Sequence, residues 1–398
     1  MVAGLDELRF VASADVYKQG RLAGRLTRTS DGSVVFAYLS EYRDGPSPLA
    51  VASTLPVTDG SVSSPHGSVP AFFAGLLPEG RRLRVLQDAV KTSLDDELTL
   101  LLAVGADVPG DVQVVPAGAP PTDPPPAVDA VEVATLDFLE LADEVDRHAL
   151  PGVQDKLSAE MISTPVATRS GRYILKLDPP DYPYLVQNED LHLRSATKLK
   201  IAVADAQKVT DRLGREGLLV TRFDRVRAGG GRWERLPLED ATQVLGLPPA
   251  SKYHIDSERV VAALSGHCTA PAVAVRNLYL QFVFAWLTGN GDLHGKNVSM
   301  LGSASGETAI APMYDLPCTL VYGDDSLALP VAGRTRGVKA RHWREFAAAI
   351  GLPERAAASA NAVALTAASA VDLSQLPFAG SPLRRAEREL GFRRAELS

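Results

Sequence analysis

The strongest hydrophobic pattern of the chain lies over residues 271–287. Apolar side chains occupy most faces of a helix drawn through this segment, and only Arg276, Asn277 and Gln281 interrupt them. Such a helix belongs in a protein core, because it has no wide polar face to turn toward water. We therefore predict a buried helix that leads directly into the Gly-rich segment 288–297 and holds its start in the core.

The first hundred residues show the pattern of a small α/β unit. Short strands are predicted over 14–17, 20–27 and 33–39, because turn-forming residues separate three short apolar runs. A helical pattern then covers 70–77, breaks at a Leu-Pro-Glu-Gly sequence and resumes over 81–90. We expect this region to fold as a subdomain of its own.

The chain changes character after residue 104. Residues 109–126 are rich in Pro, Gly and Ala, which indicates a linker or an exposed loop. A second α/β section follows, with predicted helices over 134–148 and about 188–199, and strands over 173–177, 218–223 and 232–236. Beyond residue 238 the pattern is mainly helical, with Ala-rich stretches at 346–350 and 355–370. Strands first and helices later is the order of an α+β protein.

Composition limits the classes of protein that this chain can belong to. Its 398 residues suffice for two or three domains, and 45% hydrophobic with 22% charged residues is ordinary for a globular protein. Cys268 and Cys318 are too few for a disulfide framework, and the N-terminus lacks the pattern of a secretory signal. No apolar run reaches the length of a membrane span. We expect a cytoplasmic protein without a membrane partner.

Charge gives the protein no general attraction to nucleic acid. The formal net charge is 41 minus 48, or −7. The tail over 381–398 is locally basic, but arginines and glutamates are mixed in it. A solvated helix face explains that tail more simply than a contact with DNA.

The segment 288–297 carries the most specific chemistry. Asp292 and Asn297 stand five positions apart, as in the catalytic loop of protein kinases, where the Asp accepts the proton of the attacking hydroxyl and the Asn holds magnesium. Asp315 follows after a predicted short hairpin and suits a second metal-holding acid. Lys176 lies in a predicted strand, and Glu189 is a candidate partner, because kinases pair a strand lysine with a helix glutamate.

Other interpretations of the same residues remain open at this point. Asp292 and His294 fit an ordinary turn with a surface histidine, and His294 with Asp315 fits a transition-metal site. Lys176 and Glu189 fit surface charges. Gly152 lies in a tight loop that fits either a plain turn or a phosphate-binding loop. A Walker A loop is discarded, because Asn297 replaces the Ser or Thr that would touch magnesium.

Several motifs together carry a family resemblance. They are Phe73-Ala-Gly-Leu-Leu-Pro-Glu-Gly80, Gly152-Val-Gln-Asp-Lys-Leu157, Ile174-Leu-Lys-Leu177, Asn188-Glu189, Arg222-Phe-Asp-Arg225, Glu239-Asp240 with Gln243 and Lys252-Tyr253, Gly289-Asn-Gly-Asp-Leu-His-Gly-Lys-Asn297 and Pro312-Met-Tyr-Asp315. With these in order across nearly its whole length, the chain resembles the HipA family, the serine/threonine kinase toxins of bacterial toxin-antitoxin modules. The resemblance implies a kinase-like two-lobed fold with an additional N-terminal α/β subdomain and a mainly helical C-terminal lobe. The domains expected from it are an N-terminal subdomain (1–108), a Pro-rich linker or loop (109–133), a nucleotide-binding lobe (134–236) and a helical catalytic lobe (237–398).

The resemblance also implies roles for individual residues. Asp292 is the expected catalytic base, with His294 and Lys296 beside it, and Asn297 and Asp315 are the expected magnesium ligands. The residues expected to bind ATP are Pro151, Gly152, Val153, Gln154, Asp155, Lys156, Lys176, Glu189, Thr221, Arg222, Phe223 and Tyr314. The expected partners are a protein substrate with a Ser or Thr acceptor and a small DNA-binding antitoxin, through which alone the protein would reach DNA.

The chain departs from the family pattern at two positions. Some members carry a serine three positions before the loop glycine, and its phosphorylation ejects the loop and silences the enzyme. Ala149 stands there, so silencing by this route would need another hydroxyl, such as Ser158, Ser163 or Thr164. Thr221 stands where an acidic residue can occur in the adenine-facing segment. Ala149 and the unremarkable net charge leave open a nucleotide-binding co-repressor with little kinase activity. A small-molecule kinase also stays as an alternative, because no feature of the sequence separates a protein acceptor from a metabolite acceptor.

Overall fold

The computed structural model describes most of the chain as two compact units. It describes residues 5–122, 135–138, 161–167 and 171–398. The first unit comprises Met1–Leu175, Thr210–Arg215 and Asp224–Pro249, and the second comprises Lys176–Val209, Glu216–Phe223 and Ala250–Ser398. The chain therefore contributes separate segments to each unit. The four-part division expected from the sequence stays a prediction.

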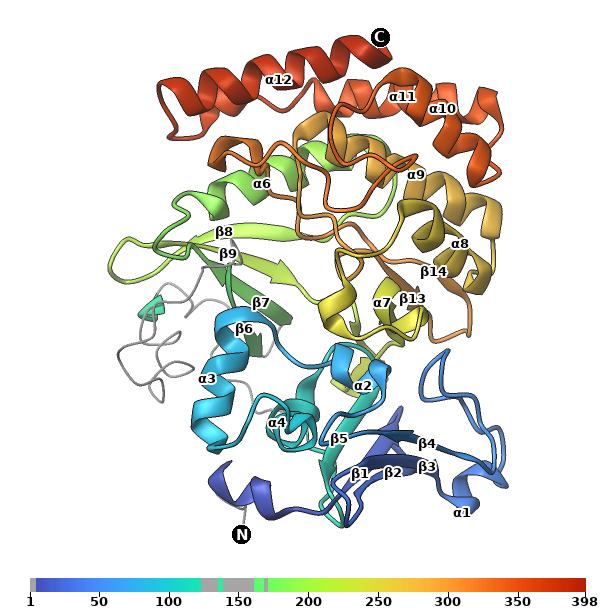
Figure 1. Ribbon diagram of the computed structural model, residues 1–398. Helices are drawn as coiled ribbons and strands as arrows, with labels where there is room; N and C mark the ends of the chain where they lie inside the picture. Colours follow the sequence, from blue (N-terminus) through green and yellow to red (C-terminus); the bar gives the residue numbers. More distant parts are fainter. Residues whose placement is uncertain (1–4, 123–134, 139–160, 168–170) are drawn as a thin grey trace. The chain divides into compact units, whose positions relative to one another are not determined.

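The first unit contains a five-stranded antiparallel sheet (Figure 1). Its strands are β1 (Ser13–Lys18), β2 (Arg21–Arg28), β3 (Val34–Tyr38), β4 (Ser61–Ser64) and β5 (Val112–Pro116), in the order β4-β3-β2-β1-β5. The three strands predicted from the sequence are confirmed as β1, β2 and β3. The sequence pattern missed β4 and β5, because each is a short edge strand whose partner lies elsewhere in the chain. The linker or exposed loop predicted over 109–126 is wrong for residues 112–116, which form the mostly buried strand β5.

Helices of the first unit share one hydrophobic core with this sheet. The α-helices are α1 (Ser40–Arg43), α2 (Ala71–Gly75), α3 (Gly80–Val90) and α4 (Glu97–Val104). Two 3-10 helices, a type labelled η, are η1 (Leu5–Phe10) and η2 (Gly105–Asp107). Leu26 and Phe36 of the sheet, Phe73 of α2 and Leu100 of α4 are buried in it. The break predicted at residues 77–80 is confirmed, since it separates α2 from α3.

A second part of the first unit comes from residues 224–249. It contains β10 (Arg225–Arg227), β11 (Trp233–Arg235), β12 (Leu238–Asp240) and α7 (Ala241–Val244), with η5 (Gly229–Gly231) between the first two strands and η6 (Pro249–Ser251) after α7. Asp240 and Gln243 form a capping box at the start of α7. Gln243 also donates a hydrogen bond of 2.9 Å to the carbonyl oxygen of Phe72. The motifs around Phe73 and Gln243 therefore meet in a structural contact.

A four-stranded sheet has the order β6-β7-β9-β8. Its strands are β6 (Ile162–Ala167), β7 (Arg172–Leu177), β8 (Ala206–Thr210) and β9 (Glu216–Thr221), and α6 (Leu185–Ala196) with η4 (Thr197–Leu199) stands between β7 and β8. The predicted strand-helix-strand succession is confirmed. The helix begins three residues earlier than predicted, where the Asp178 carboxylate accepts the backbone N–H of Val186. The helix predicted over 134–148 lies outside the described residues, apart from 135–138.

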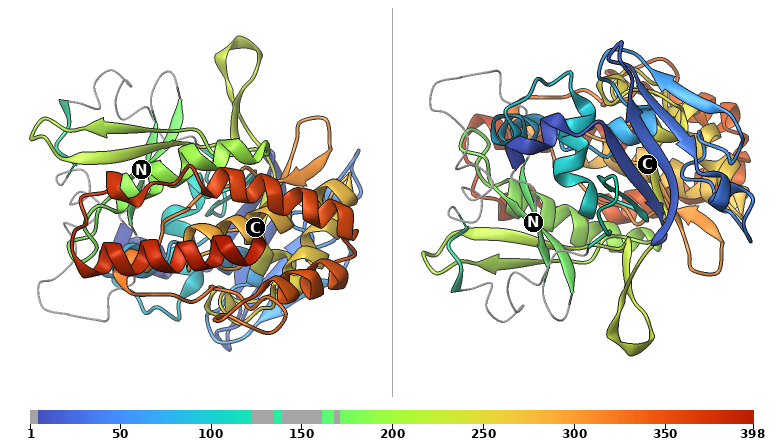
Figure 2. Two further views of the ribbon diagram at one scale, coloured as in Figure 1. Left: turned by 90° about the horizontal axis from the view of Figure 1, so that it is seen from above. Right: turned by 90° about the horizontal axis from the view of Figure 1, so that it is seen from below.

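The helical part of the second unit is built around one central helix. Its helices are α8 (Ser257–His267), α9 (Pro271–Thr288), α10 (Ala340–Ala349), α11 (Glu354–Ala368) and α12 (Ser381–Leu397), with η7 (Leu320–Tyr322) and η8 (Leu373–Gln375). The predicted buried helix is confirmed as α9, and α8, α11 and α12 pack against it. Seen from above, α11 and α12 run beside each other (Figure 2). The remaining strands, β13 (Ser299–Gly302) and β14 (Thr308–Ile310), form a hairpin.

Helices α11 and α12 change two expectations from the sequence, namely that no apolar run reaches the length of a membrane span and that the C-terminal tail is a solvated helix face. One helical stretch among the described residues, Glu354–Gln375, is long and apolar enough to cross a membrane. Its apolar composition comes largely from alanines, and α11 packs against α9. The tail predicted as a solvated helix is helical as α12. However, the side chain of Arg393 is only 6% exposed, so this arginine is not part of a solvated face.

Candidate active site

A buried ion cluster in the second unit joins three residues that are far apart in the sequence. The Lys176 Nζ atom lies 2.7 and 2.9 Å from the two carboxylate oxygens of Glu189 and 2.8 Å from Asp315 Oδ1. Lys176 comes from the end of β7, Glu189 from α6, and Asp315 from the segment after β14. The predicted strand lysine and helix glutamate therefore pair as expected.

Electrostatics fix the charges within this cluster. Burial lowers the pKa of Lys176, but the carboxylates of Asp315 and Glu189 raise it by more, so the ammonium stays charged. Burial raises the pKa of Asp315, but the Lys176 ammonium lowers it by more. For Glu189 burial outweighs the attraction of Lys176, and its pKa is raised. The carboxylate of Asp315, which is 30% exposed on its side chain, is the one that faces outward.

Asn297 and Asp315 form the pair that was predicted to hold a metal. A hydrogen bond from the Asn297 amide helps to lower the pKa of Asp315. The same amide donates to the carbonyl oxygen of Asp292 at 2.9 Å. Carboxylate and amide oxygens are the ligands that Mg²⁺ prefers, so this donor set fits that ion. Among the described residues no group of three or more His, Cys, Asp or Glu side chains could hold a metal, which gives the transition-metal interpretation of His294 no support.

The segment Gly289–Asn297, here the candidate catalytic loop, is held by its own hydrogen bonds. Asn290 accepts the backbone N–H of Asp292 through its side-chain oxygen at 2.8 Å. The backbone N–H of Asn297 donates to the carbonyl oxygen of His294 at 2.9 Å. Gly289 has a φ of +74° and ends α9, which explains why a glycine stands there. The buried helix α9 is therefore followed directly by a tightly folded loop.

Asp292 is held from outside the loop as well. The hydroxyl of Tyr253 donates a hydrogen bond of 2.8 Å to Asp292 Oδ1. The Nε2 atom of His294 lies 3.9 Å from the same oxygen. The rings of Tyr253 and His294 meet edge to face, with centroids 4.9 Å apart. Tyr253 thus contacts both the candidate base and its neighbouring histidine.

A pair of reciprocal hydrogen bonds fixes α6 to the segment that follows Asp315. Asn188 donates to the carbonyl oxygen of Cys318 at 3.0 Å and accepts its backbone N–H at 2.9 Å. Both residues are fully buried. This contact holds Glu189 and Asp315 in register around Lys176.

The remaining predicted site residues fall into three groups. Tyr314 donates to the backbone carbonyl oxygen of Lys296 at 2.8 Å, and its ring lies 5.7 Å from that of Phe223. Arg222 is buried, and the backbone N–H of Thr221 donates to the carbonyl oxygen of Asp205. The residues of the predicted phosphate loop, Pro151 to Lys156, lie outside the described residues, as do Ala149 and Ser158. Their roles stay predictions.

Sequence reasoning missed four supporting residues: Asn188, Tyr253, Asn290 and Thr319. Thr319 accepts the backbone N–H of Gly291 at 2.9 Å through its hydroxyl. Asn188, Tyr253 and Asn290 belong to motifs that carried the resemblance. This membership was the available signal, although it named no partner for any of the three. Thr319 had no such signal.

The fold and the lysine-centred ion cluster define a kinase-like protein. The HipA N-terminal domain model matches residues 14–115, and the HipA-like C-terminal domain model matches residues 148–371. The chain belongs to the HipA family.

Individual relatives agree with this assignment. The Sinorhizobium fredii protein Y4mE, whose name classes it provisionally as a kinase, is 31% identical over 366 residues, 85% of this chain and 86% of its own. The protein named serine/threonine-protein kinase toxin HipA, from Shewanella oneidensis, is 30% identical over 322 residues, 74% of this chain and 72% of its own.

A solved structure confirms the fold. It is that of the Shewanella oneidensis HipA, HipB and operator DNA complex, which covers 96% of this chain and 95% of its own with a TM-score of 0.72 at 22% identity. The predicted mixed, kinase-like fold class is therefore confirmed.

Proposed function

We propose that this protein is an ATP-dependent serine/threonine protein kinase and the toxin of a toxin-antitoxin module. The observation that carries the proposal is the Lys176 ammonium bound by both Glu189 and Asp315. Kinases use the same lysine-glutamate pair to place ATP phosphates. The name of the Shewanella oneidensis relative supports a Ser or Thr acceptor and the toxin role.

The proposed chemistry follows from the charges of these side chains. Asp292 accepts the proton of the acceptor hydroxyl as that oxygen attacks the γ-phosphate, and the bond between the γ-phosphorus and the β,γ-bridging oxygen breaks. Lys176 contacts the phosphates, while Asn297 and Asp315 would hold Mg²⁺. The ion, when bound, neutralises negative charge on the phosphates. The protein contributes mainly position and fixed charge, as this reaction demands.

The proposed partner is a small DNA-binding antitoxin in the cytoplasm. The structural relative was solved with HipB and its operator DNA, which supports a partner of that kind. The net charge of −7 supports contact with DNA through the antitoxin rather than directly.

Phosphoryl transfer with purified protein tests the proposal. The full chain is incubated with Mg²⁺, labelled ATP and a proteome extract, alongside the variants Asp292→Asn and Asp256→Asn. Asp256 is an exposed aspartate at the start of α8 and serves as the matched control. We expect Asp292→Asn to transfer label roughly 10²- to 10⁴-fold more slowly, and Asp256→Asn to match the wild type.

Other outcomes decide between this proposal and its alternatives. Equal transfer by Asp292→Asn and wild type would remove Asp292 as the base. Tight ATP binding without transfer, together with a salt-sensitive DNA complex that needs the antitoxin, would identify a co-repressor module. Label found only in small molecules would identify a metabolite kinase.

A further inference from the structure

Residues 319–326, here the supporting turn, enclose the start of the candidate catalytic loop. The backbone N–H of Thr319 donates to the carbonyl oxygen of Gly289 at 2.8 Å, and the Thr319 hydroxyl accepts the N–H of Gly291 at 2.9 Å. A Cβ atom at Gly291 would lie 2.5 Å from Thr319 Oγ1 and 2.7 Å from the carbonyl oxygen of Ser326. The loop therefore fits only while the supporting turn keeps its position.

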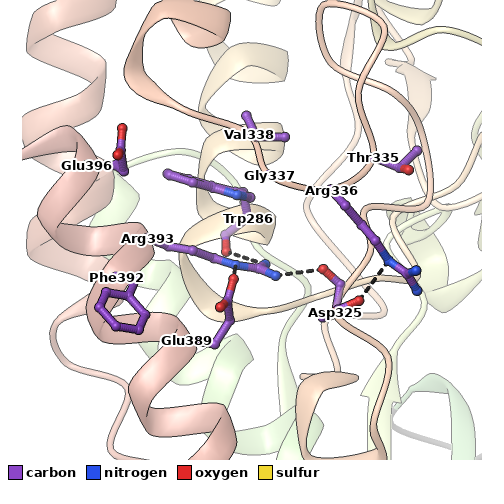
Figure 3. A pocket seen from close by; sticks show the side chains of 10 residues that line it. All are labelled: Trp286, Asp325, Thr335, Arg336, Gly337, Val338, Glu389, Phe392, Arg393 and Glu396. Atoms are coloured by element: carbon purple, nitrogen blue, oxygen red, sulfur yellow. Dashed lines mark hydrogen bonds and ion pairs between the residues drawn. The ribbon is translucent and has the colours of Figure 1, made fainter.

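The supporting turn and the end of α9 are both bound by one arginine from α12. Arg393 donates from Nη1 to the carbonyl oxygen of Trp286 at 3.1 Å and from Nη2 to that of Asp325 at 2.7 Å. Its Nε atom pairs with Glu389 at 2.8 Å (Figure 3). The guanidinium thus has a partner for each nitrogen, and a buried cation so satisfied is costly to replace.

The two carbonyl groups flank the candidate catalytic loop along the chain. Trp286 lies three residues before Gly289, and its carbonyl oxygen also accepts the N–H of that glycine. Asp325 lies inside the supporting turn, where its side chain pairs with Arg336 at 2.7 Å. One planar guanidinium therefore sets the spacing between the helix end and the turn that together hold Gly291.

The cavity that Figure 3 shows is lined by Arg393, Trp286 and Asp325 among others, and by none of the candidate site residues. The contact is therefore a separate feature from the ion cluster.

We propose that Arg393 is a positioning residue for the candidate catalytic loop, so that α12 sets the geometry of Asp292 from a distance. The catalytic part of this inference rests on the proposed kinase function. The structural part, control of the loop by α12, does not.

Amide hydrogen exchange on the full chain tests the structural part without any assay of activity. We expect Arg393→Met to exchange at least tenfold faster than wild type over residues 287–295, while the first-unit strands β1 to β3 keep their wild-type rates. Arg388→Met, an exposed arginine on the same helix, is the matched control and should change neither region. Unchanged exchange of the loop in Arg393→Met, or equal acceleration in both variants, overturns the proposal.

A more conservative variant keeps the test decisive if Arg393→Met does not fold. Arg393→Lys retains the charge, but one ammonium cannot reproduce the planar fork that reaches two carbonyl groups. We expect an intermediate acceleration of exchange, and wild-type exchange in this variant would overturn the proposal.

Kinetics test the catalytic part. We expect Arg393→Met to lower kcat at least tenfold and to leave the Kd for ATP within twofold, because displacement of a reacting group costs rate more than ground-state binding. A changed Kd with unchanged kcat would contradict positioning. A wild-type protein without kinase activity would end the proposed function and leave the exchange result standing.

Discussion

The hydroxyl of Tyr253 lies 2.8 Å from Asp292 Oδ1 and donates a hydrogen bond to it. The segment that carries Tyr253 is also tied to the loop through its backbone, since the N–H of Gly295 donates to the carbonyl oxygen of Lys252 at 2.9 Å. Tyr253 is therefore placed to orient the carboxylate of the candidate base. Tyr253 is 43% exposed, so its substitution disturbs little of the core.

Tyr253→Phe should lower kcat roughly tenfold and leave the KM for ATP unchanged. The variant keeps the ring against His294 and removes only the hydroxyl, and a hydrogen bond to a charged group contributes about 1.5 to 3 kcal/mol. Steady-state kinetics with a protein acceptor measures the effect. Tyr42→Phe, which loses a phenol hydrogen bond to Leu49 in the first unit, is the control. Equal kcat values for both variants and wild type would remove Tyr253 from the site.

Lys176→Met should destabilise the protein by about 3 to 5 kcal/mol, because it leaves the buried carboxylate of Glu189 and the partly buried carboxylate of Asp315 without their shared cation. Urea unfolding of the full chain measures this loss. Adding Glu189→Gln should recover part of the lost stability, since it removes one of the two negative charges. A double variant that is less stable than Lys176→Met would show that charge repulsion is not the cause.

The stability of the protein should fall as the pH drops from about 6.5 to about 4, because of His192. Burial, reinforced by Arg394, lowers the pKa of this fully buried histidine to about 4. Between these pH values the unfolded chain takes up a proton that the folded protein does not, so acid favours unfolding. The contribution is fully present above pH 6.5 and is lost as the pH falls to 4, a change on the order of 3 kcal/mol.

Substitution of His192 isolates its contribution to the pH dependence of stability. His192→Gln should flatten the dependence of unfolding free energy on pH in that range, whereas His254→Gln, at an exposed site, should leave it as in wild type. Denaturant unfolding at a series of pH values gives both curves. Parallel curves for His192→Gln and wild type would contradict the assignment.

Gln243→Ala should destabilise the first unit by about 1 to 3 kcal/mol. The substitution removes the reciprocal half of the α7 capping box and leaves the carbonyl oxygen of Phe72 without its donor. Thermal unfolding measures the change. Gln207→Ala, at an exposed strand position, is the control and should unfold as wild type does. A similar shift in both variants would argue against a special role for the Gln243 contact.

The candidate site was predictable from the sequence where its signal is local. The five-residue spacing of Asp292 and Asn297 and the apolar pattern of α9 are both properties of one continuous segment. The pairing of Lys176 with Glu189 was predictable, because kinases pair a strand lysine with a helix glutamate, and these two residues lie 13 positions apart on a strand and the helix that follows it. The role of residues 151–156 rests on the resemblance alone.

Contacts between distant segments were not predictable in this way. Tyr253 and Asp292 are separated by 39 residues, Arg393 and Trp286 by 107, and Asn188 and Cys318 by 130. Short edge strands such as β4 also escaped, because a strand of four residues carries too little alternation to stand out. The basic pattern of the tail likewise gave no sign that Arg393 is buried.

By itself the sequence determined the longer elements, among them β1 to β3 and the buried helix α9, and which loop carries an acid and an amide at the right spacing. Those properties depend on side chains within one or two turns of the backbone, so the local order of residues is enough to set them. Only the tertiary structure decided which distant groups meet: the Asp315 carboxylate on Lys176, the Tyr253 phenol on Asp292, and the Arg393 guanidinium on the carbonyl groups of Trp286 and Asp325. A contact between distant residues forms only when packing brings the two ends of a long intervening segment together. No local pattern of residues specifies which ends come together.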